Sequence, residues 1–251
     1  MTALTRRELH ARALGSLVTF SLLETLCTLD LFGSEVKPIT VQWLKQVHQL
    51  GLDVQGQNLE QTDWQRQIEE LFSKVELDEL LRFVDFEKLT ARLQLVDNGA
   101  RSLQFRFQEA EGVPQKVSFG KQIFALKKDR SVVPHGHNNM TTAFLILKGE
   151  FHGRHFDRLE DQPEHLIIKP TIDRKFKAGD CSSISDDKDN IHWFQATSET
   201  AFIFNIHVLD VRPGSREASG RVYLDPQGEK LAGGKIRAPR LDHFEVHKRY
   251  G

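Results

Sequence analysis

The sequence predicts an α+β fold, with a helical domain over residues 1–97 followed by an antiparallel β-barrel over residues 98–251. Three observations support this division. Apolar residues recur at helical spacing as far as about Leu95, and the pattern changes to a period of two near the Asp-Asn-Gly segment at 97–99. Beyond that point, short strand patterns follow one another without helical patterns between them, which indicates an antiparallel barrel or sandwich.

Helical periodicity accounts for most of the N-terminal half. We expect a first helix over 6–29, a second over 39–50, a third that begins at Trp64 with Asp63 as its N-cap, and short helices over 78–93. The third helix has the clearest apolar face, made of Trp64, Ile68, Leu71, Phe72 and Val75. No catalytic residue types gather in this half, because its histidines His10 and His48 are isolated.

The C-terminal half consists of apolar stretches separated by turns rich in Gly, Pro and Asp. Strands are predicted over 103–107, 117–119, 144–147, 166–168 and 201–208. After Arg212 the chain is rich in Gly, Pro and charged residues, and one short strand is predicted there, over 221–224.

Composition restricts the classes of partner and location. Lys and Arg total 34 against 35 for Asp and Glu, so no nucleic-acid partner is expected. Because no apolar run approaches the roughly twenty residues that span a bilayer, no membrane insertion is expected. The two cysteines, Cys27 and Cys181, stand in unrelated contexts, which indicates a reducing compartment and predicts a cytoplasmic location.

An export signal is the alternative for the N-terminus, because Arg6-Arg7 precedes an apolar segment. Against it, Thr5 and Glu8 have the spacing of a helix capping box, Glu24 interrupts the apolar segment, and no small-x-small cleavage site follows. The features favour an amphipathic first helix.

Two separated histidine motifs predict a metal site. His135 and His137 are two residues apart on an extended segment, so their rings point to the same face of a sheet. A Gly-Asp turn at 179–180 precedes a strand and an acidic loop over 186–189, and His192 follows that loop. Three imidazoles from two strands can converge on one ion.

These motifs resemble the cupin superfamily over roughly residues 100–225. The first cupin motif is HxH, then a Glu, then a Gly at a β-turn, and the second is a Gly-containing turn followed by a His. Counting back from Gly149, the position of the cupin Glu holds Thr142. The resemblance therefore implies a jelly roll that binds metal through three histidines only.

A three-histidine cupin is similar to the thiol dioxygenases: cysteine dioxygenase, mercaptopropionate dioxygenase, cysteamine dioxygenase and plant cysteine oxidase. This resemblance implies Fe(II) held by His135, His137 and His192, with dioxygen and a small thiol as reactants and a sulfinate as product. Cysteine dioxygenase has a Ser-x-His-x-Tyr string where this chain has Asn205-Ile206-His207-Val208-Leu209. The resemblance implies a catalytic or orienting role for His207 and Asn205. The missing Tyr weighs against cysteine itself as the substrate.

Other polar residues near the predicted strands have candidate roles. Three arginines, Arg154, Arg158 and Arg174, are candidate ligands for a substrate carboxylate. His152 and His155 follow the Gly149 turn, and we expect them at the rim or the surface, with His155 a minor candidate for the metal site. The acidic run at 186–189 lacks the spacing of a calcium loop and is expected to be a solvated hairpin.

Two other functional classes stay open at the level of sequence. One is a redox-neutral isomerase or lyase that uses Zn, Mn or Ni as a Lewis acid. The other is a non-enzymatic sensor of metal or ligand, in which the helical domain contacts a partner or forms a homo-oligomer. GxSxG, P-loop, GxGxxG and HExxH motifs are missing, which disfavours hydrolases, nucleotide-binding proteins and zincins.

Overall fold

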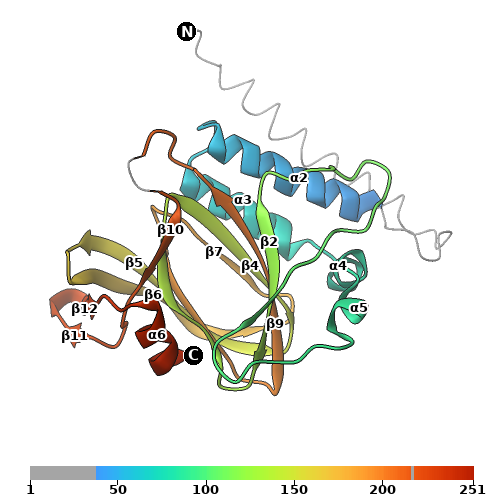
Figure 1. Ribbon diagram of the computed structural model, residues 1–251. Helices are drawn as coiled ribbons and strands as arrows, with labels where there is room; N and C mark the ends of the chain where they lie inside the picture. Colours follow the sequence, from blue (N-terminus) through green and yellow to red (C-terminus); the bar gives the residue numbers. More distant parts are fainter. Residues whose placement is uncertain (1–37, 216–217) are drawn as a thin grey trace, which may run out of the picture.

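The computed structural model describes residues 38–215 and 218–251 (Figure 1). Its strands form two antiparallel sheets, and four helices precede them. The helices are α2 Pro38–Gln55, α3 Gln61–Ser73, α4 Leu77–Phe83 and α5 Phe86–Thr90, and α6 His243–Tyr250 lies near the C-terminus. The predicted first helix, the Arg6-Arg7 pair and Cys27 lie outside the described residues.

The smaller sheet has the strand order β1-β2-β9-β4-β7. Its strands are β1 Arg101–Leu103, β2 Gly120–Lys127, β9 Thr200–Leu209, β4 Met140–Lys148 and β7 Cys181–Ile184. The larger sheet has the order β10-β3-β8-β5-β6-β12-β11. Its strands are β10 Gly220–Tyr223, β3 Ser131–Asn138, β8 Ile191–Ala196, β5 Glu150–Asp161, β6 His165–Lys177, β12 Ile236–Pro239 and β11 Glu229–Lys230.

The α+β class and the antiparallel pairing are therefore confirmed. Within the described residues the strands form two separate sheets, and no hydrogen-bonded ladder closes them into one barrel. In this part of the chain, no helix combines the length and the apolar character needed to cross a bilayer.

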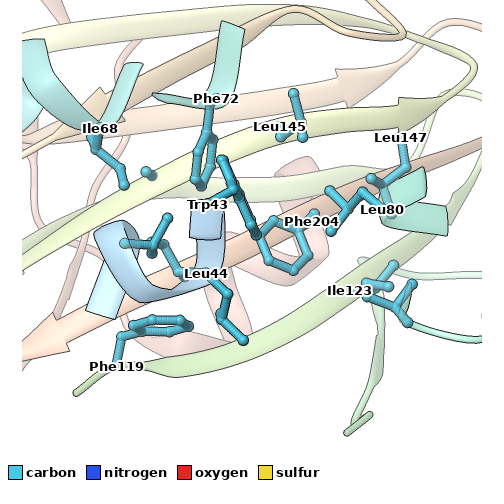
Figure 2. Packing of buried hydrophobic residues seen from close by; sticks show 14 of the residues in the cluster. Trp43, Leu44, Ile68, Phe72, Leu80, Phe119, Ile123, Leu145, Leu147 and Phe204 are labelled. Carbon is cyan, nitrogen blue, oxygen red and sulfur yellow. The ribbon is translucent and has the colours of Figure 1, made fainter. Parts of the chain in front are cut away.

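Helices α2 to α5 pack against the outer face of the smaller sheet. Trp43 of α2, Phe72 of α3 and Phe204 of β9 form one aromatic cluster, with ring centroids 5.7 to 6.3 Å apart (Figure 2). Because the helices and this sheet share one hydrophobic core, neither buries its apolar face without the other. The boundary at residue 97 between two domains stays a prediction.

The central strands of the smaller sheet are buried on both faces, which explains their nearly continuous apolar sequences. On β9, Phe202, Phe204 and Ile206 belong to the cluster shared with the helices, whereas Ile203 belongs to a second cluster between the two sheets. Side chains alternate along a strand, so Asn205 shares the inner face with Ile203. The inner face is where polar residues interrupt the apolar sequence.

Three local predictions are wrong: the start of α3, the strand over 103–107, and the strand over 117–119, which lies before β2 begins at Gly120. Helix α3 begins at Gln61 with Glu60 as its N-cap, and Asp63 lies inside the first turn, where its carboxylate pairs with Arg66 at 3.1 Å. Strand β1 ends at Leu103, because the next aromatic residues pack on the helical layer instead of pairing with a strand. Phe107, for example, stacks on Phe83 with ring centroids 4.9 Å apart.

The chain after residue 224 contains more regular structure than the sequence predicts. Strands β11 and β12 extend the larger sheet, and α6 follows with a capping box between Asp242 and Glu245. Tyr250 of α6 packs on Trp193 of β8, with ring centroids 5.0 Å apart. Pro226 and Gly228 lie in the turn before β11, and Gly233 and Gly234 lie between β11 and β12.

Candidate metal centre

The three predicted ligands lie on two neighbouring strands of the larger sheet. His135 and His137 are both on β3, and their spacing of two turns both rings to one face. His192 is on β8 and stands directly opposite His135 in the antiparallel register. The structure thus brings together the three histidines that the sequence singles out.

The three rings meet in the interior. Exposed fractions are 3% for His135 and His137 and 1% for His192. Nε2 of His135 lies 3.1 Å from Nε2 of His192, and one nitrogen of each ring lies within 4.8 Å of the others. Two nitrogens that each bind one ion at about 2.1 Å are roughly 3 to 3.4 Å apart, so the first pair has the required separation.

Two of the rings are held through their other nitrogen. Nδ1 of His135 donates to the carbonyl oxygen of Val133 at 2.8 Å, which leaves the lone pair on Nε2. Nδ1 of His137 lies 3.0 Å from the hydroxyl of Thr142, and its Nε2 is buried without a partner among the described residues. Such contacts fix the ring orientation of metal-binding histidines.

Burial keeps all three imidazoles neutral. Removal from water lowers the pKa of His135 to about 3, and the neighbouring Arg221 lowers it further. Burial also lowers the pKa of His137 and His192 well below the ordinary value, with the nearby histidines acting in the same direction. Since only the neutral ring binds a metal, these residues fit a divalent ion at neutral pH.

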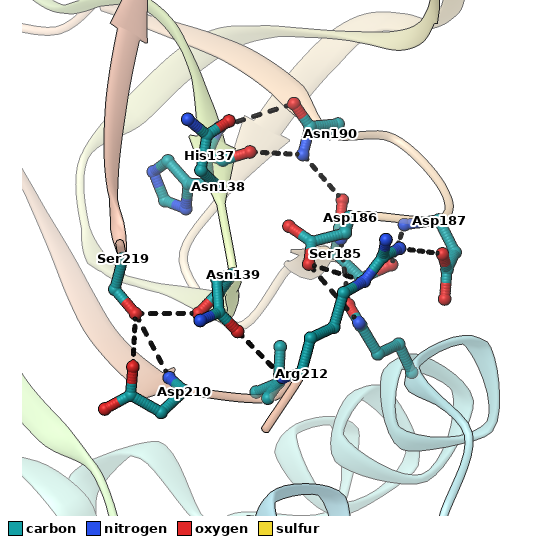
Figure 3. Close-up of polar contacts among 12 residues, drawn as sticks. His137, Asn138, Asn139, Ser185, Asp186, Asp187, Asn190, Asp210, Arg212 and Ser219 are labelled. Carbon is teal, nitrogen blue, oxygen red and sulfur yellow. Dashed lines mark hydrogen bonds and ion pairs between the residues drawn. The ribbon is translucent and has the colours of Figure 1, made fainter. Parts of the chain in front are cut away.

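Asn190 fixes the backbone beside the centre (Figure 3). Its Nδ2 donates to the carbonyl oxygens of His137 and Ser185 at 2.9 and 3.0 Å, and its Oδ1 accepts from the N–H of His137 at 3.3 Å. A Cβ on Gly136 would lie 2.7 Å from that Oδ1, so the glycine between the two histidines leaves room for the contact.

The acidic loop at 186–189 is not a solvated hairpin, contrary to expectation. Asp189 is buried, and Arg212 pairs with both Asp186 and Asp187 (Figure 3). The N–H of Arg212 also donates to the side chain of Asn139, in the turn between β3 and β4. Arg212 therefore links the acidic loop to the turn that follows the HxH strand.

A cavity of about 80 Å³ adjoins the histidines. It lies between the two sheets, because its walls come from β2, β4 and β9 of the smaller sheet and from β3, β8 and β10 of the larger. Besides the three histidines, it is lined by Phe124, Met140, Thr142, Phe144, Asn205, His207, Leu209 and Arg221. Among the residues that the structure describes, no carboxylate lines this cavity.

Asn205 and His207, the predicted catalytic residues, both line this cavity from β9. Nε2 of Gln122 donates to Oδ1 of Asn205 at 3.3 Å. The ring of His207 lies over Gly120, where a Cβ would stand 2.1 Å from Nε2. Burial and Arg221 both lower the pKa of His207.

The three predicted substrate-binding arginines do not line the cavity. Arg154 lies over the ring of Trp193 at 4.1 Å, and Arg174 lies over that of Phe176 at 3.6 Å. Arg158 donates to Oδ1 of Asn138 at 2.6 Å and pairs with Asp161. Their role in substrate binding stays a prediction that none of these contacts supports.

Arg221 and Tyr223 are the residues that sequence reasoning missed. In β10 they stand opposite His137 and His135 respectively, and the ring of Tyr223 lies 5.8 Å from that of His135. The alternation of side chains along the predicted strand over 221–224 already indicates that Arg221 and Tyr223 share one face of it. The sequence does not reveal that this strand pairs with β3.

His155 is in the interior, and the expectation that it lies at the rim is wrong. Its exposed fraction is 0%, and its ring lies 6.4 Å from that of His192, its cross-strand neighbour. His152, on the same strand, is partly exposed and contacts Asp173. Alternation along β5 holds from Phe151 to His155 and puts His155 on the buried face, because the β-bulge comes only after it, between His155 and Phe156.

No protein-family model matches the chain, and no curated protein matches it. Among solved structures, it is similar to a cupin superfamily protein from Desulfitobacterium hafniense, with 16% identity over 49% of this chain and 88% of that one and a TM-score of 0.32. It is also similar to recombinant oxalate oxidase in complex with glycolate, with 15% identity over 51% of this chain and 56% of that one and a TM-score of 0.35. A third similar structure is procruciferin, an 11S globulin from Brassica napus, with 13% identity over 43% of this chain and 23% of that one and a TM-score of 0.32.

The chain therefore spans about a quarter of procruciferin and little more than half of oxalate oxidase. At such identities and TM-scores, the likeness carries no argument about activity, substrate or partner.

Proposed function

We propose that the two sheets form a cupin-type jelly roll in which His135, His137 and His192 bind one Fe(II) ion, and that the protein uses dioxygen to oxidise a small thiol to a sulfinate. The observation that carries this proposal is the donor set, which consists of three buried neutral imidazoles in a cavity that no carboxylate of residues 38–215 or 218–251 lines. Neutral ligands leave the full charge of the ion in place, which favours binding of a thiolate.

The bound ion would supply open coordination positions where the thiolate and dioxygen meet. In the overall reaction, RSH + O2 gives RSO2H. Both oxygen atoms end on sulfur, and the sulfur loses as many electrons as the dioxygen gains, so no further reductant is required.

The residues around the centre would bind and orient the thiol. Arg221 is the one cationic side chain among the described residues that line the cavity, and it would attract an anionic substrate. Since Oδ1 of Asn205 already accepts from Gln122, the amide nitrogen supplies the donors for substrate. His207 is held neutral by its lowered pKa and would donate one N–H to a substrate oxygen. Phe144, which is buried, adds an apolar wall.

Oxygen consumption tests the proposal. Protein loaded with Fe(II) is offered mercaptopropionate, cysteine and cysteamine at an oxygen electrode, with mass spectrometry to detect a product heavier by two oxygen atoms. We expect the thiol with a carboxylate and no amine to react fastest, because Arg221 faces the cavity and no acidic side chain lines it. His192→Ala should abolish both metal binding and oxygen uptake.

Two outcomes would change the assignment. Oxygen uptake that does not rise with any thiol, in protein shown to hold iron, would exclude thiol oxidation. Protein that retains Zn, Mn or Ni after purification and consumes no oxygen would favour the redox-neutral isomerase or lyase.

A further inference from the structure

His192 differs from the other two histidines of the centre in the surroundings of its second ring nitrogen. His135 donates through Nδ1 to a backbone carbonyl, and His137 has the hydroxyl of Thr142 beside Nδ1. Nδ1 of His192 is buried and has no hydrogen-bond partner within residues 38–215 and 218–251. A histidine that binds metal through Nε2 carries its proton on Nδ1, and this N–H is ordinarily bound to an acceptor.

His155 also has a buried ring nitrogen without a hydrogen-bond partner among the described residues. Its side chain is completely buried, and this nitrogen is Nδ1. The surrounding rings are apolar: Phe194 lies 5.5 Å away between centroids, and Phe144 and Phe176 each lie 6.4 Å away. A polar side chain is costly in such a place unless its nitrogens are hydrogen-bonded.

The two histidines face each other across neighbouring strands. They stand opposite one another in the register of β5 and β8, with ring centroids 6.4 Å apart and planes at 64°. A ring nitrogen lies about 1.1 Å from its centroid, so a direct hydrogen bond brings the centroids to roughly 5 Å. The observed separation is longer than that and is of the size that one bridging water spans.

We propose that His155 is a positioning residue for the metal ligand His192, and that it accepts the Nδ1–H of His192 through one buried water. The direction of every bond follows from the donors available. Nδ1–H of His192 donates to the water, the water donates to Nδ1 of His155, and Nε2–H of His155 donates to the hydroxyl oxygen of Ser182, 3.3 Å away. Each ring then carries one proton, as a neutral imidazole requires.

This inference rests on the proposed function only in that the three histidines bind a metal. It does not depend on which substrate or reaction follows. Its consequence is that His155, which lies among Phe144, Phe176 and Phe194, orients the ring of His192. The second nitrogen of all three ligands is then held in place.

Zinc affinity tests the proposal without reference to activity. His155→Phe fills the aromatic site and removes both nitrogens, and His155→Asn keeps an acceptor near the position of Nδ1. Competition of the full chain with a chromophoric chelator should show Zn(II) binding about 10- to 100-fold weaker for His155→Phe than for the wild type. His155→Asn should regain most of that loss. The matched control is His152→Phe, on the same strand but partly exposed, which should bind Zn(II) like the wild type.

The results separate this proposal from the proposed function. Wild-type protein that fails to bind Zn(II) would contradict the metal centre itself. If the wild type binds Zn(II) and His155→Phe binds it equally tightly, only the role of His155 is wrong. The same conclusion follows if His155→Asn is as weak as His155→Phe, because then the acceptor at Nδ1 does not matter.

A measurement on the unaltered protein guards against misfolded variants. Long-range ¹⁵N–¹H correlation spectra of the Zn(II)-loaded wild type report which ring nitrogen bears the proton. We expect His155 with its proton on Nε2 and His192 with its proton on Nδ1. A proton on Nδ1 of His155 would overturn the proposal, since that nitrogen could not then accept.

Discussion

Thr142 occupies the place where a carboxylate ligand is expected from the resemblance to cupins. Its exposed fraction is 1%, and its hydroxyl lies 3.0 Å from Nδ1 of His137. The side chain thus contacts a proposed metal ligand and adds no negative charge of its own. A glutamate at the metal would offset one positive charge of the ion, whereas a threonine leaves that charge available for an anionic substrate.

Thr142→Val tests this contact at the scale of one atom. The variant keeps the volume and loses the hydroxyl, so Nδ1 of His137 is left unpaired at a cost of about 1–3 kcal/mol. We expect metal affinity to fall by about 10- to 100-fold, measured by competition with a chromophoric chelator.

Thr141→Val is the matched control. Thr141 is as deeply buried as its neighbour, but its hydroxyl has no partner among the described residues. Replacement by a methyl group should leave metal affinity unchanged. Equal losses in the two variants would show that the loss comes from general disturbance of β4 and not from the hydrogen bond to His137.

At the scale of elements, β4 and β9 separate the apolar core under the helices from the cavity beside the three histidines. Leu145 and Phe204 pack under the helices, whereas Thr142 and Asn205 face the space between the sheets. Alternation along each strand sends successive side chains to opposite sides. The helices therefore seal the outer face of the sheet that carries the predicted catalytic residues.

Phe72→Ala tests the contribution of the helical layer. Phe72 is 1% exposed and packs on Trp43 and Phe204, so its removal leaves a cavity and should destabilise the protein by about 3–5 kcal/mol. Urea unfolding followed by circular dichroism measures the loss. Leu52→Ala on α2 is the control, since Leu52 is 44% exposed and its replacement should change stability by about 0.5 kcal/mol or less.

A small effect of Phe72→Ala, no larger than that of Leu52→Ala, would contradict the shared core. It would mean that the helices and the smaller sheet unfold independently of one another.

For the whole molecule, burial of several neutral histidines makes stability depend on pH. Burial lowers the pKa of His135 and of His155 to about 3, and it lowers the pKa of His137 and His192 well below the ordinary value. In the unfolded chain these rings titrate near about 6.5. Between the two values the unfolded state binds more protons than the folded state, so the free energy of unfolding falls as the pH falls.

We therefore expect the urea midpoint of the metal-free protein, held in EDTA, to decrease steadily from about pH 7.5 to about pH 5. This range lies above that in which ordinary carboxyl groups titrate. His155→Phe removes one of the titrating groups and should reduce the slope. A midpoint that stays constant or rises toward pH 5 would show that the buried rings do not resist protonation.

The sequence by itself determined the class of fold, the antiparallel strands and the convergence of His135, His137 and His192. These features depend on local periodicity and on the alternation of side chains along a strand, which a single sequence displays. The same alternation places Asn205 and His207, two residues apart on β9, on one face of their strand. Each of these inferences depends on residues that are close together in the chain. The convergence of the histidines also requires that the HxH segment and the segment around His192 lie side by side.

Only the tertiary structure decided which other side chains reach the cavity. Arg221 lies beside the histidines because β10 pairs with β3, and His155 lies behind His192 because β5 pairs with β8. The predicted arginines, Arg154, Arg158 and Arg174, lie outside the cavity for the same reason. A strand has two faces and several possible neighbours, so its sequence alone does not show which site a charged side chain reaches. Strand order and register are set by packing across the whole molecule, so no local pattern records them.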